Sequence, residues 1–367
     1  MNIKKVSIFL VDLPMKVAFT TGFGTISTRP TVIVKLETSN GVIGWGESAA
    51  LDSPIYNAED VYTALHVIKD CILPRLLNHN VTLEEYAEET KWIRGNRIAR
   101  FGVECALWDI HSQEKGVPIS VLIGGKRQKV AVGESVGIQA EIIDTLKIIE
   151  KRLGEGYQRI KIKIRPGWDL NIIKAIRKVY PKIPLMVDAN SAYTLKDIYI
   201  FQKLDEYNLM MIEQPLADDD IVDHAKIQKM IKTPICLDES IENAEDARKA
   251  IELGSCKIIN VKPGRVGGLM ESKLINDLAK KHHIPLWCGG MLESGIAKPF
   301  NMAAASLSEF SLPADMSPSD NYFKESITSP DILVSKGGFI GVPSVTGLGF
   351  KVSEKLINKY TKEKYNL

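Results

Sequence analysis

The sequence lacks the features that mark several protein classes. None of its apolar runs approaches the roughly 18–20 residues that a membrane-spanning helix needs. The formal net charge is only +2, so no basic or acidic excess points to a nucleic acid or a membrane surface. Asp12 and Pro14 interrupt the apolar stretch near the first residue, which predicts a first strand rather than a signal peptide. We therefore expect neither nucleic acid nor membrane as a partner.

Cysteine is scarce and forms no pattern. The sequence has five cysteines, an odd count, and no two of them have the CxxC spacing typical of zinc sites. This argues against a disulfide framework and favours reduced thiols in a cytoplasmic protein. The five are Cys71, Cys105, Cys236, Cys256 and Cys288.

The pattern of the chain changes near residue 125. Its 367 residues exceed one typical domain. Strand-like alternation comes first and helical periodicity follows, which predicts an α+β domain over residues 1–125. A (β/α)-barrel is expected over residues 126–322, and the glycine- and serine-rich segment 323–367 is expected to return to the first domain. In that domain the predicted strands are 3–12, 31–38 and 41–47, with Ser39-Asn40-Gly41 as a hairpin turn, and the predicted helices are about 57–77, 83–93 and 98–115.

A unit of about 25 residues repeats in the middle of the chain. Lys163, Asp188, Glu213 and Asp238 are each 25 residues apart, and Lys262 follows 24 residues later. Each of them closes a short apolar run, and amphipathic helices are expected between the runs. Successive parallel strand-helix units of this regularity predict an α/β fold with a (β/α)-barrel. The five runs are RIKIKI, PLMVDAN, LMMIEQP, PICLDES and KIINVKP.

Asp188, Glu213 and Asp238 close three successive predicted strands. A single acid at a strand end is more often the cap of the following helix. However, strand ends of a barrel converge on one mouth, so these three carboxylates can point into one space. Like charges there raise one another's pKa unless a cation neutralises them. We predict that the three acids bind Mg²⁺, which prefers oxygen ligands and for which Mn²⁺ or another divalent cation can substitute.

Two lysines flank these acids, Lys163 on the strand before them and Lys262 on the strand after. Such a pair suits removal of a weakly acidic proton next to a carboxylate, so both are predicted to be catalytic. A lysine acts as a base only when neutral, and Lys161 supplies a like charge that favours the neutral form of Lys163. In the alternating stretch RIKIKIR, Arg165 is expected at the rim and Arg159 as a structural ion-pair partner.

These residues resemble the enolase superfamily, in its muconate-lactonizing-enzyme subgroup. The subgroup's marks are the KxK pair Lys161 and Lys163, the three acids, and Lys262. The mandelate-racemase subgroup uses a His–Asp pair on later strands, whereas His282 and His283 fall at the end of a predicted helix. The resemblance runs over nearly the full chain, from FTTGFGTIS to VTGLG, and is carried by IKIRPGWD, VDANSAYT, IEQPL, ICLDESI, NVKPGRVGG and WCGGMLESGI.

Within the subgroup, the chain resembles the branch that contains o-succinylbenzoate synthases and N-succinylamino acid racemases. The resemblance implies that the first domain caps the barrel and that its first loop closes over the substrate. Phe19, Thr21, Phe23 and Gly24 match that loop. Asp238 fits the 25-residue interval and Glu239 does not, so we expect Glu239 to contact the metal ligands rather than the metal. The other positions that match substrate-binding residues of the branch, together with Lys161, are Ser135, Asn190, Gly289, Gly290 and Met291.

Two activities follow from the resemblance, both on a small carboxylate substrate in a homo-oligomer, a dimer or an octamer. The first is syn dehydration of 6-hydroxy-2-succinylcyclohexadiene-1-carboxylate through a metal-stabilised enediolate, a step of menaquinone biosynthesis. Lys163 would remove the proton and Lys262 would stay protonated. The second is racemisation of N-acyl or N-succinylamino acids, with one lysine on each face of the planar intermediate.

Three other hypotheses fit less well. A dipeptide epimerase would carry a DxD-like pair near the eighth strand, but Asp315 and Asp320 lie five residues apart rather than two. A barrel that had lost catalysis would lack a ligand or a lysine. A Schiff-base aldolase on the same fold would use one buried lysine and no group of three acids.

Overall fold

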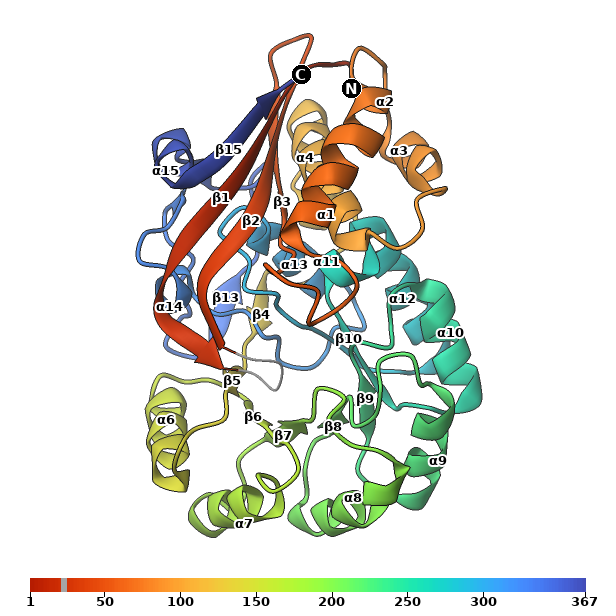
Figure 1. The fold of residues 1–367 in the computed structure, drawn as a ribbon, viewed down its shortest axis with the longest axis vertical. Coiled ribbons are helices and arrows are strands. Elements are labelled where there is room, and N and C mark those ends of the chain that lie inside the picture. The colour runs from red at the N-terminus through yellow and green to blue at the C-terminus, as the bar shows by residue number, and fades with distance from the viewer. Residues whose placement is uncertain (21–24) are drawn as a thin grey trace.

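The computed structural model describes residues 1–20 and 25–367, without the side chains of residues 17–20, 25–27 and 320. It has an antiparallel sheet with helices at one end and a ring of parallel strands and outer helices at the other (Figure 1). No helix in the described part of the chain is long and apolar enough to cross a membrane. The five cysteines, all within that part, are free thiols.

The first part of the chain forms the antiparallel sheet, in the order β15-β1-β2-β3. The predicted hairpin is confirmed, because β2 pairs with β3 and the turn lies between Thr38 and Ile43. The first strand is longer than the predicted 3–12, since it continues past Pro14 and pairs with β2 again from Phe19 after a shift in register. The strands are β1 (Ile3–Thr20), β2 (Thr25–Thr38), β3 (Ile43–Ser48) and β15 (Thr361–Asn366).

A long helix, α4 (Arg97–Lys115), packs on this sheet against β3. The contact depends on glycine, because a Cβ atom at Gly46 would lie 1.9 Å from the carbonyl oxygen of Gly102. The predicted helix over 57–77 is one helical run in three pieces, with a π-helical turn η1 between α1 and α2. The helices before the ring are α1 (Val61–His66), η1 (Val67–Ile72), α2 (Leu73–Leu76), α3 (Leu83–Thr90) and α5 (Ile119–Leu122).

Seven parallel strands form the second sheet, in the order β11-β10-β9-β8-β7-β6-β5. Each strand pairs with the next one along the chain, as the regular interval predicted, so the α/β fold is confirmed. The strands are β5 (Glu134–Val136), β6 (Ile160–Lys163), β7 (Leu185–Asp188), β8 (Ile212–Glu213), β9 (Ile235–Leu237), β10 (Ile258–Val261) and β11 (Leu286–Cys288).

Helices connect these strands and lie outside the ring (Figure 1). Local signals set their ends: the side chain of Asp169 accepts a hydrogen bond from the first residue of α7, and Gly254 ends α10 at a φ of 71°. The helices are α6 (Ile142–Gly154), α7 (Leu170–Val179), η2 (Leu195–Asp197), α8 (Ile198–Leu204), η3 (Asp205–Tyr207), α9 (Val222–Met230), α10 (Ala244–Leu253), α11 (Pro263–Val266), α12 (Leu269–His282) and α13 (Lys298–Ala305).

An irregular segment, residues 312–315, closes the ring between β11 and the chain before β5. On one side the amide of Asp315 donates to the carbonyl of Cys288 at 2.9 Å. On the other side the amide of Ala314 donates to Ala131 at 2.9 Å, and the amide of Gly133 donates to Ala314 at 2.8 Å. We call residues 312–315 the closing segment.

Inside the ring lies a small apolar cluster of Met186, Met211, Cys236, Ile258 and Trp287, separate from the main core. Side chains two residues apart on a strand share a face. The side chains of the three predicted metal ligands therefore lie one layer above this cluster, towards the carboxyl ends of the strands.

The last part of the chain returns to the first sheet, where β15 pairs with β1 antiparallel (Figure 1). This pairing is what the predicted return of residues 323–367 requires, although the domain boundaries themselves stay a prediction. The remaining elements are β4 (Lys129–Ala131), α14 (Ser319–Tyr322), β12 (Thr328–Ser329), β13 (Phe339–Gly341), β14 (Lys351–Val352) and α15 (Glu354–Tyr360).

Candidate active site

The alternating stretch RIKIKIR forms β6, and its lysines point into the ring. Lys161 is 4% exposed and Lys163 is 7% exposed, so the polar face of this strand is buried. Arg165 is exposed beyond the strand end. Arg159 is buried and forms an ion pair of 2.6 Å with Asp315. The expected positions of both arginines therefore match the structure.

The three predicted ligands, Asp188, Glu213 and Asp238, are each at most 1% exposed. In the sheet, Asp188 pairs in register with Glu213. Lys163 Nζ lies 2.6 Å from Asp188 Oδ2, and Lys161 Nζ lies 3.2 Å from the same oxygen and 3.1 Å from Glu213 Oε2. The structure thus joins the first two acids to the two lysines of β6.

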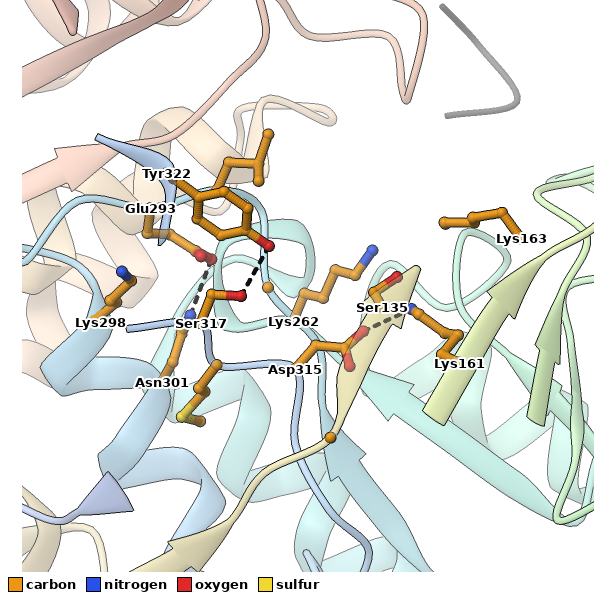
Figure 2. A pocket seen from close by; sticks show the side chains of 14 residues that line it. Ser135, Lys161, Lys163, Lys262, Glu293, Lys298, Asn301, Asp315, Ser317 and Tyr322 are labelled. Atoms are coloured by element: carbon orange, nitrogen blue, oxygen red, sulfur yellow. Dashed lines mark hydrogen bonds and ion pairs between the residues drawn. The ribbon is translucent and has the colours of Figure 1, made fainter. Parts of the chain in front are cut away.

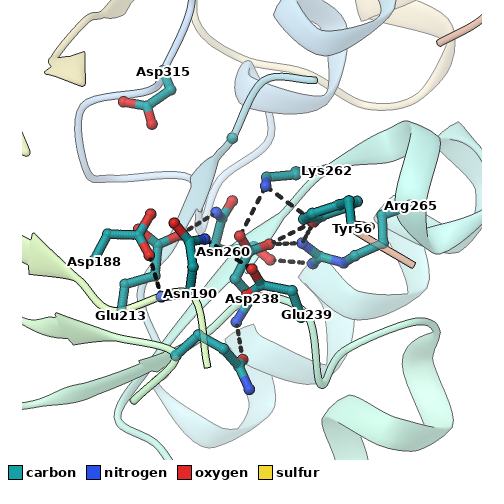
Figure 3. Close-up of polar contacts among 12 residues, drawn as sticks. Tyr56, Asp188, Asn190, Glu213, Asp238, Glu239, Asn260, Lys262, Arg265 and Asp315 are labelled. Carbon is teal, nitrogen blue, oxygen red and sulfur yellow. Dashed lines mark hydrogen bonds and ion pairs between the residues drawn. The ribbon is translucent and has the colours of Figure 1, made fainter. Parts of the chain in front are cut away.

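Lys262 lies on the other side of the acids (Figure 3). Its Nζ is 2.8 Å from Asp238 Oδ2 and 3.0 Å from the hydroxyl of Tyr56. Arg265 also forms an ion pair with Asp238, and the Tyr56 hydroxyl donates to Asp238 Oδ1 at 3.2 Å. The sequence interpretation did not include Tyr56 or Arg265. Tyr56 precedes α1 in an irregular stretch, and Arg265 lies in a four-residue helix, so neither belongs to a repeating pattern.

Asn190 and Glu239 continue the hydrogen-bond network that starts at Lys163. Asn190 accepts a hydrogen bond of 2.6 Å from Lys163 and donates one of 2.9 Å to Glu239 Oε1. Its backbone has a φ of 42°, a left-handed conformation that non-glycine residues adopt at a cost and that is common at functional sites. Asn260, another residue that the sequence did not indicate, donates to Glu213 Oε1 at 2.7 Å.

Burial and charge shift the pKa values in opposite directions. Burial raises the pKa of Asp188, but Lys163 and Lys161 outweigh it and hold that pKa well below its ordinary range. Burial and the neighbouring Asp188 raise the pKa of Glu213 above its ordinary value, and they raise that of Glu239 to about 7. The acids therefore repel one another, and the site holds more carboxylates than its cations fully stabilise.

This donor set fits a hard divalent cation. As the side chains stand, no three His, Cys, Asp or Glu side chains among the described residues are grouped closely enough to hold an ion. The acids contact lysines and Arg265 instead. Nevertheless all the donors are oxygens, and Glu239 Oε2 is buried with no hydrogen-bond partner in the described structure. Crowded carboxylates with an unsatisfied oxygen match the chemistry of Mg²⁺ rather than that of zinc.

One cavity lies above these residues (Figure 2). Among the predicted residues, Ser135, Lys161, Lys163, Lys262 and Gly290 line it. Asn190, Gly289 and Met291 are not in its lining. A Cβ atom at Gly289 would lie 2.7 Å from Lys262 Cε, and Met291 accepts a hydrogen bond from Arg29 through its carbonyl.

Several residues that line the cavity were not predicted. Gly133 directly precedes β5, Lys298 and Asn301 lie in α13, and Tyr322 ends α14. The others lie in irregular segments after β11, where no periodic pattern marks them: Leu292, Glu293, Met316 and Ser317. Asp315, which the sequence indicated only as an epimerase acid, also lines the cavity. Among the predicted loop residues, Thr21, Phe23 and Gly24 lie outside the described residues, and the side chain of Phe19 is not described.

The fold and this row of lysines and acids define a class of barrel enzymes. The chain has a capped ring of parallel strands whose carboxyl ends carry lysine, acid, acid, acid and lysine in order. Family models assign it accordingly: "Mandelate racemase / muconate lactonizing enzyme, N-terminal domain" matches residues 3–124, and "Enolase C-terminal domain-like" matches residues 144–356. The chain belongs to this family of the enolase superfamily.

Individual relatives cover the whole chain. It is 49% identical to o-succinylbenzoate synthase of Bacillus subtilis over 360 residues, 98% of this chain and 96% of that protein. It is 41% identical to N-succinylamino acid racemase of Thermus thermophilus, over 98% of each chain. A solved structure of an enolase-superfamily member from Listeria innocua superimposes with a TM-score of 0.96 and 37% identity, covering 100% of this chain and 99% of that one.

Proposed function

We propose that this protein is an o-succinylbenzoate synthase, a hydro-lyase that removes water from 6-hydroxy-2-succinylcyclohexadiene-1-carboxylate. The observation that carries the proposal is the pair Lys163 and Lys262, which line one cavity and bracket buried acids. The 49% identity to the Bacillus subtilis synthase over nearly the whole chain supports this choice of reaction. Such an enzyme belongs in menaquinone biosynthesis in the cytoplasm.

In the proposed reaction Lys163, in its neutral form, removes the proton next to the substrate carboxylate. The electrons of that C–H bond form the enediolate and then expel the hydroxyl group, which leaves as water with a proton returned by Lys163 on the same face. Lys262 stays protonated, because its contacts with Asp238 and Tyr56 favour the charged form. Lys161 adds positive charge beside the reacting carboxylate.

A divalent cation belongs to the proposal, with Asp188, Glu213 and Asp238 as the residues that would hold it. Mg²⁺ is the expected ion, and Mn²⁺ or another divalent cation is expected to substitute. When bound, it supplies positive charge to the carboxylate oxygens of the substrate, where negative charge develops. We also propose a homo-oligomer, either a dimer or an octamer.

Racemisation of N-succinylamino acids is a second candidate activity. It requires a proton donor and acceptor on each face of a planar intermediate, and Lys163 and Lys262 reach the cavity from different strands, β6 and the end of β10. The 41% identity to the Thermus thermophilus racemase favours it. Both reactions begin with the same proton abstraction, so one site can carry both.

The dipeptide-epimerase hypothesis is weakened by the contacts of Asp315. That acid would have to bind the ammonium group of a dipeptide. Its two carboxylate oxygens instead contact Arg159 and Lys161, each at 2.6 Å.

Steady-state kinetics with Mg²⁺ on two substrates test the proposal: the cyclohexadiene precursor of o-succinylbenzoate and a panel of N-succinylamino acids. We expect a high kcat/KM on the first, and its loss after EDTA treatment or in Lys163→Ala. A kcat/KM on the amino acids that equals or exceeds that on the first substrate would make racemisation the main role. Absence of both activities in metal-loaded protein would overturn the proposal.

A further inference from the structure

Asp315 connects the closing segment of the ring to the active site. Its amide holds the segment to β11, and its side chain points into the cavity, where it meets Lys161 (Figure 2). Asp315 Oδ2 lies 2.6 Å from Lys161 Nζ, which is shorter than the contacts of 3.1 Å and 3.2 Å that Lys161 makes with Glu213 and Asp188. Asp315 is therefore the nearest anion to this lysine.

The other carboxylate oxygen of Asp315 is held by a buried arginine. Arg159 is 1% exposed and contacts Asp315 Oδ1 at 2.6 Å and the Pro313 carbonyl at 3.0 Å. Its guanidinium also lies over the ring of Trp287, 4.9 Å from the centroid. Glycine makes room for it, because a Cβ atom at Gly133 would be 2.5 Å from Arg159 Nε. The carboxylate thus has a fixed orientation.

The charges of Arg159, Asp315 and Lys161 are arranged so that the positive charge of Lys161 is not cancelled by Asp315. Arg159 offsets the charge of Asp315, which leaves the positive charge of Lys161 directed at Glu213, Asp188 and the cavity. A lysine side chain has several freely rotating bonds, so an ammonium without an anchor samples many positions. Charged groups contribute most to a reaction when they already lie where charge develops.

We propose that Asp315 is a positioning residue for Lys161, holding its ammonium where the reacting carboxylate of the substrate binds. This role rests on the proposed function, since it assumes that Lys161 faces that carboxylate during proton abstraction. The competing explanation is structural: the pair Arg159–Asp315 would only fasten the closing segment, and Lys161 would be incidental.

A double-mutant cycle separates the two. Asp315→Asn keeps the size of the side chain and removes its charge, and we expect kcat to fall about 10- to 100-fold, as for a lost charge-assisted contact, while KM rises only about threefold. In the Lys161→Met background the same change should cost less than about twofold. Equal losses in both backgrounds would overturn the role. Asp223→Asn, which removes an exposed 2.6 Å pair with Lys226, is the matched control and should have no effect.

A binding measurement keeps the test decisive if Lys161→Met has too little activity. Calorimetric titration with o-succinylbenzoate requires no turnover. Asp315→Asn should weaken binding in the wild-type background and leave it unchanged in Lys161→Met, whereas equal weakening in both would contradict the proposal. Asp315→Glu keeps the charge and should recover part of the affinity. It also serves as the second variant if Asp315→Asn folds poorly. A wild type without activity on either substrate counts against the proposed function, and the binding cycle still decides the role of Asp315.

Discussion

Lys163 and Lys262 have different partners, although the sequence places them in symmetrical positions. Lys163 contacts Asp188 and the amide oxygen of Asn190, whereas Lys262 contacts Asp238 and the phenol of Tyr56. Burial lowers the pKa of Lys262, but Tyr56, Glu239 and Glu213 outweigh it and raise that pKa above its ordinary value. These different partners agree with the proposed dehydration, in which Lys163 moves the proton and Lys262 stays protonated. In racemisation both lysines would transfer a proton, one on each face of the intermediate.

Exchange of the substrate α-hydrogen for deuterium in D₂O tests whether Lys163 and Lys262 act on different faces of the substrate. Lys262→Met should leave exchange of one enantiomer of an N-succinylamino acid nearly unchanged and slow exchange of the other by about 10²- to 10⁴-fold, the usual contribution of a general base. Lys163→Met should reverse the preference. The measurement is the loss of the α-proton NMR signal, with the exposed Lys257→Met as control. If either variant slowed α-hydrogen exchange of both enantiomers equally, the two lysines would not serve separate faces of the substrate.

At the level of the elements, the contact of β3 with α4 leaves little room for change. The backbones approach so closely at Gly46 and Gly102 that no side chain fits between them. This contact sets the angle at which the first sheet rests on its long helix, and the same helix touches α11, which follows Lys262. The small residues where β3 contacts α4 therefore help to position the whole first domain against the barrel.

Gly46→Ala should destabilise the protein strongly. The added Cβ atom would meet the Gly102 carbonyl oxygen at 1.9 Å, so the strand or the helix must shift, and we expect the free energy of unfolding to fall by about 3 kcal/mol. Urea unfolding followed by circular dichroism measures this. Gly154→Ala, at the end of α6 with nothing within 4 Å, is the control and should be neutral or stabilising by up to about 1 kcal/mol. An unchanged midpoint for Gly46→Ala would show that the crossing relaxes easily.

On the scale of the whole molecule, buried acids tie distant segments together. Asp109 on α4 accepts hydrogen bonds from the amide of Trp45 on β3 at 2.9 Å and from the amide of Leu348 in the C-terminal part at 3.1 Å. Glu104, one turn earlier, accepts from the amide of Leu269 at the start of α12 at 2.9 Å. Burial raises the pKa of each of these two carboxyls to about 7.

These raised values predict a direction for the dependence of stability on pH. Between pH 3.8, the ordinary pKa of an aspartate, and a folded pKa of about 7, Asp109 keeps its proton in the folded protein and loses it in the unfolded chain. Its contribution to stability is therefore complete below about pH 4 and is lost as the pH rises towards 7. Urea unfolding at pH 5, 6, 7 and 8 should show a decreasing free energy of unfolding, with a smaller slope in Asp109→Asn. A free energy that rises over this interval would refute the assignment.

The sequence by itself determined the barrel and the order of its active-site residues. The interval of about 25 residues from Lys163 to Lys262 appears in the structure as adjacent parallel strands, β6 to β10, in sequential order. The physical reason is local: each strand-helix unit has its own hydrophobic period and its own helix caps, and parallel strands of such units must end at the same mouth. Residues at equivalent positions of a repeat are therefore neighbours in space.

Only the tertiary structure decided which other residues join them. Tyr56, Arg265 and Asp315 come from irregular or very short segments, so no periodicity marks them, and each reaches the site through contacts between distant parts of the chain. The sequence suggested Asp315 only as an epimerase acid. The spacing of acids along a chain does not show which cation each carboxylate will contact in the folded protein. That choice depends on the burial of Arg159 and on the closure of the ring by residues 312–315, which are properties of the packed molecule.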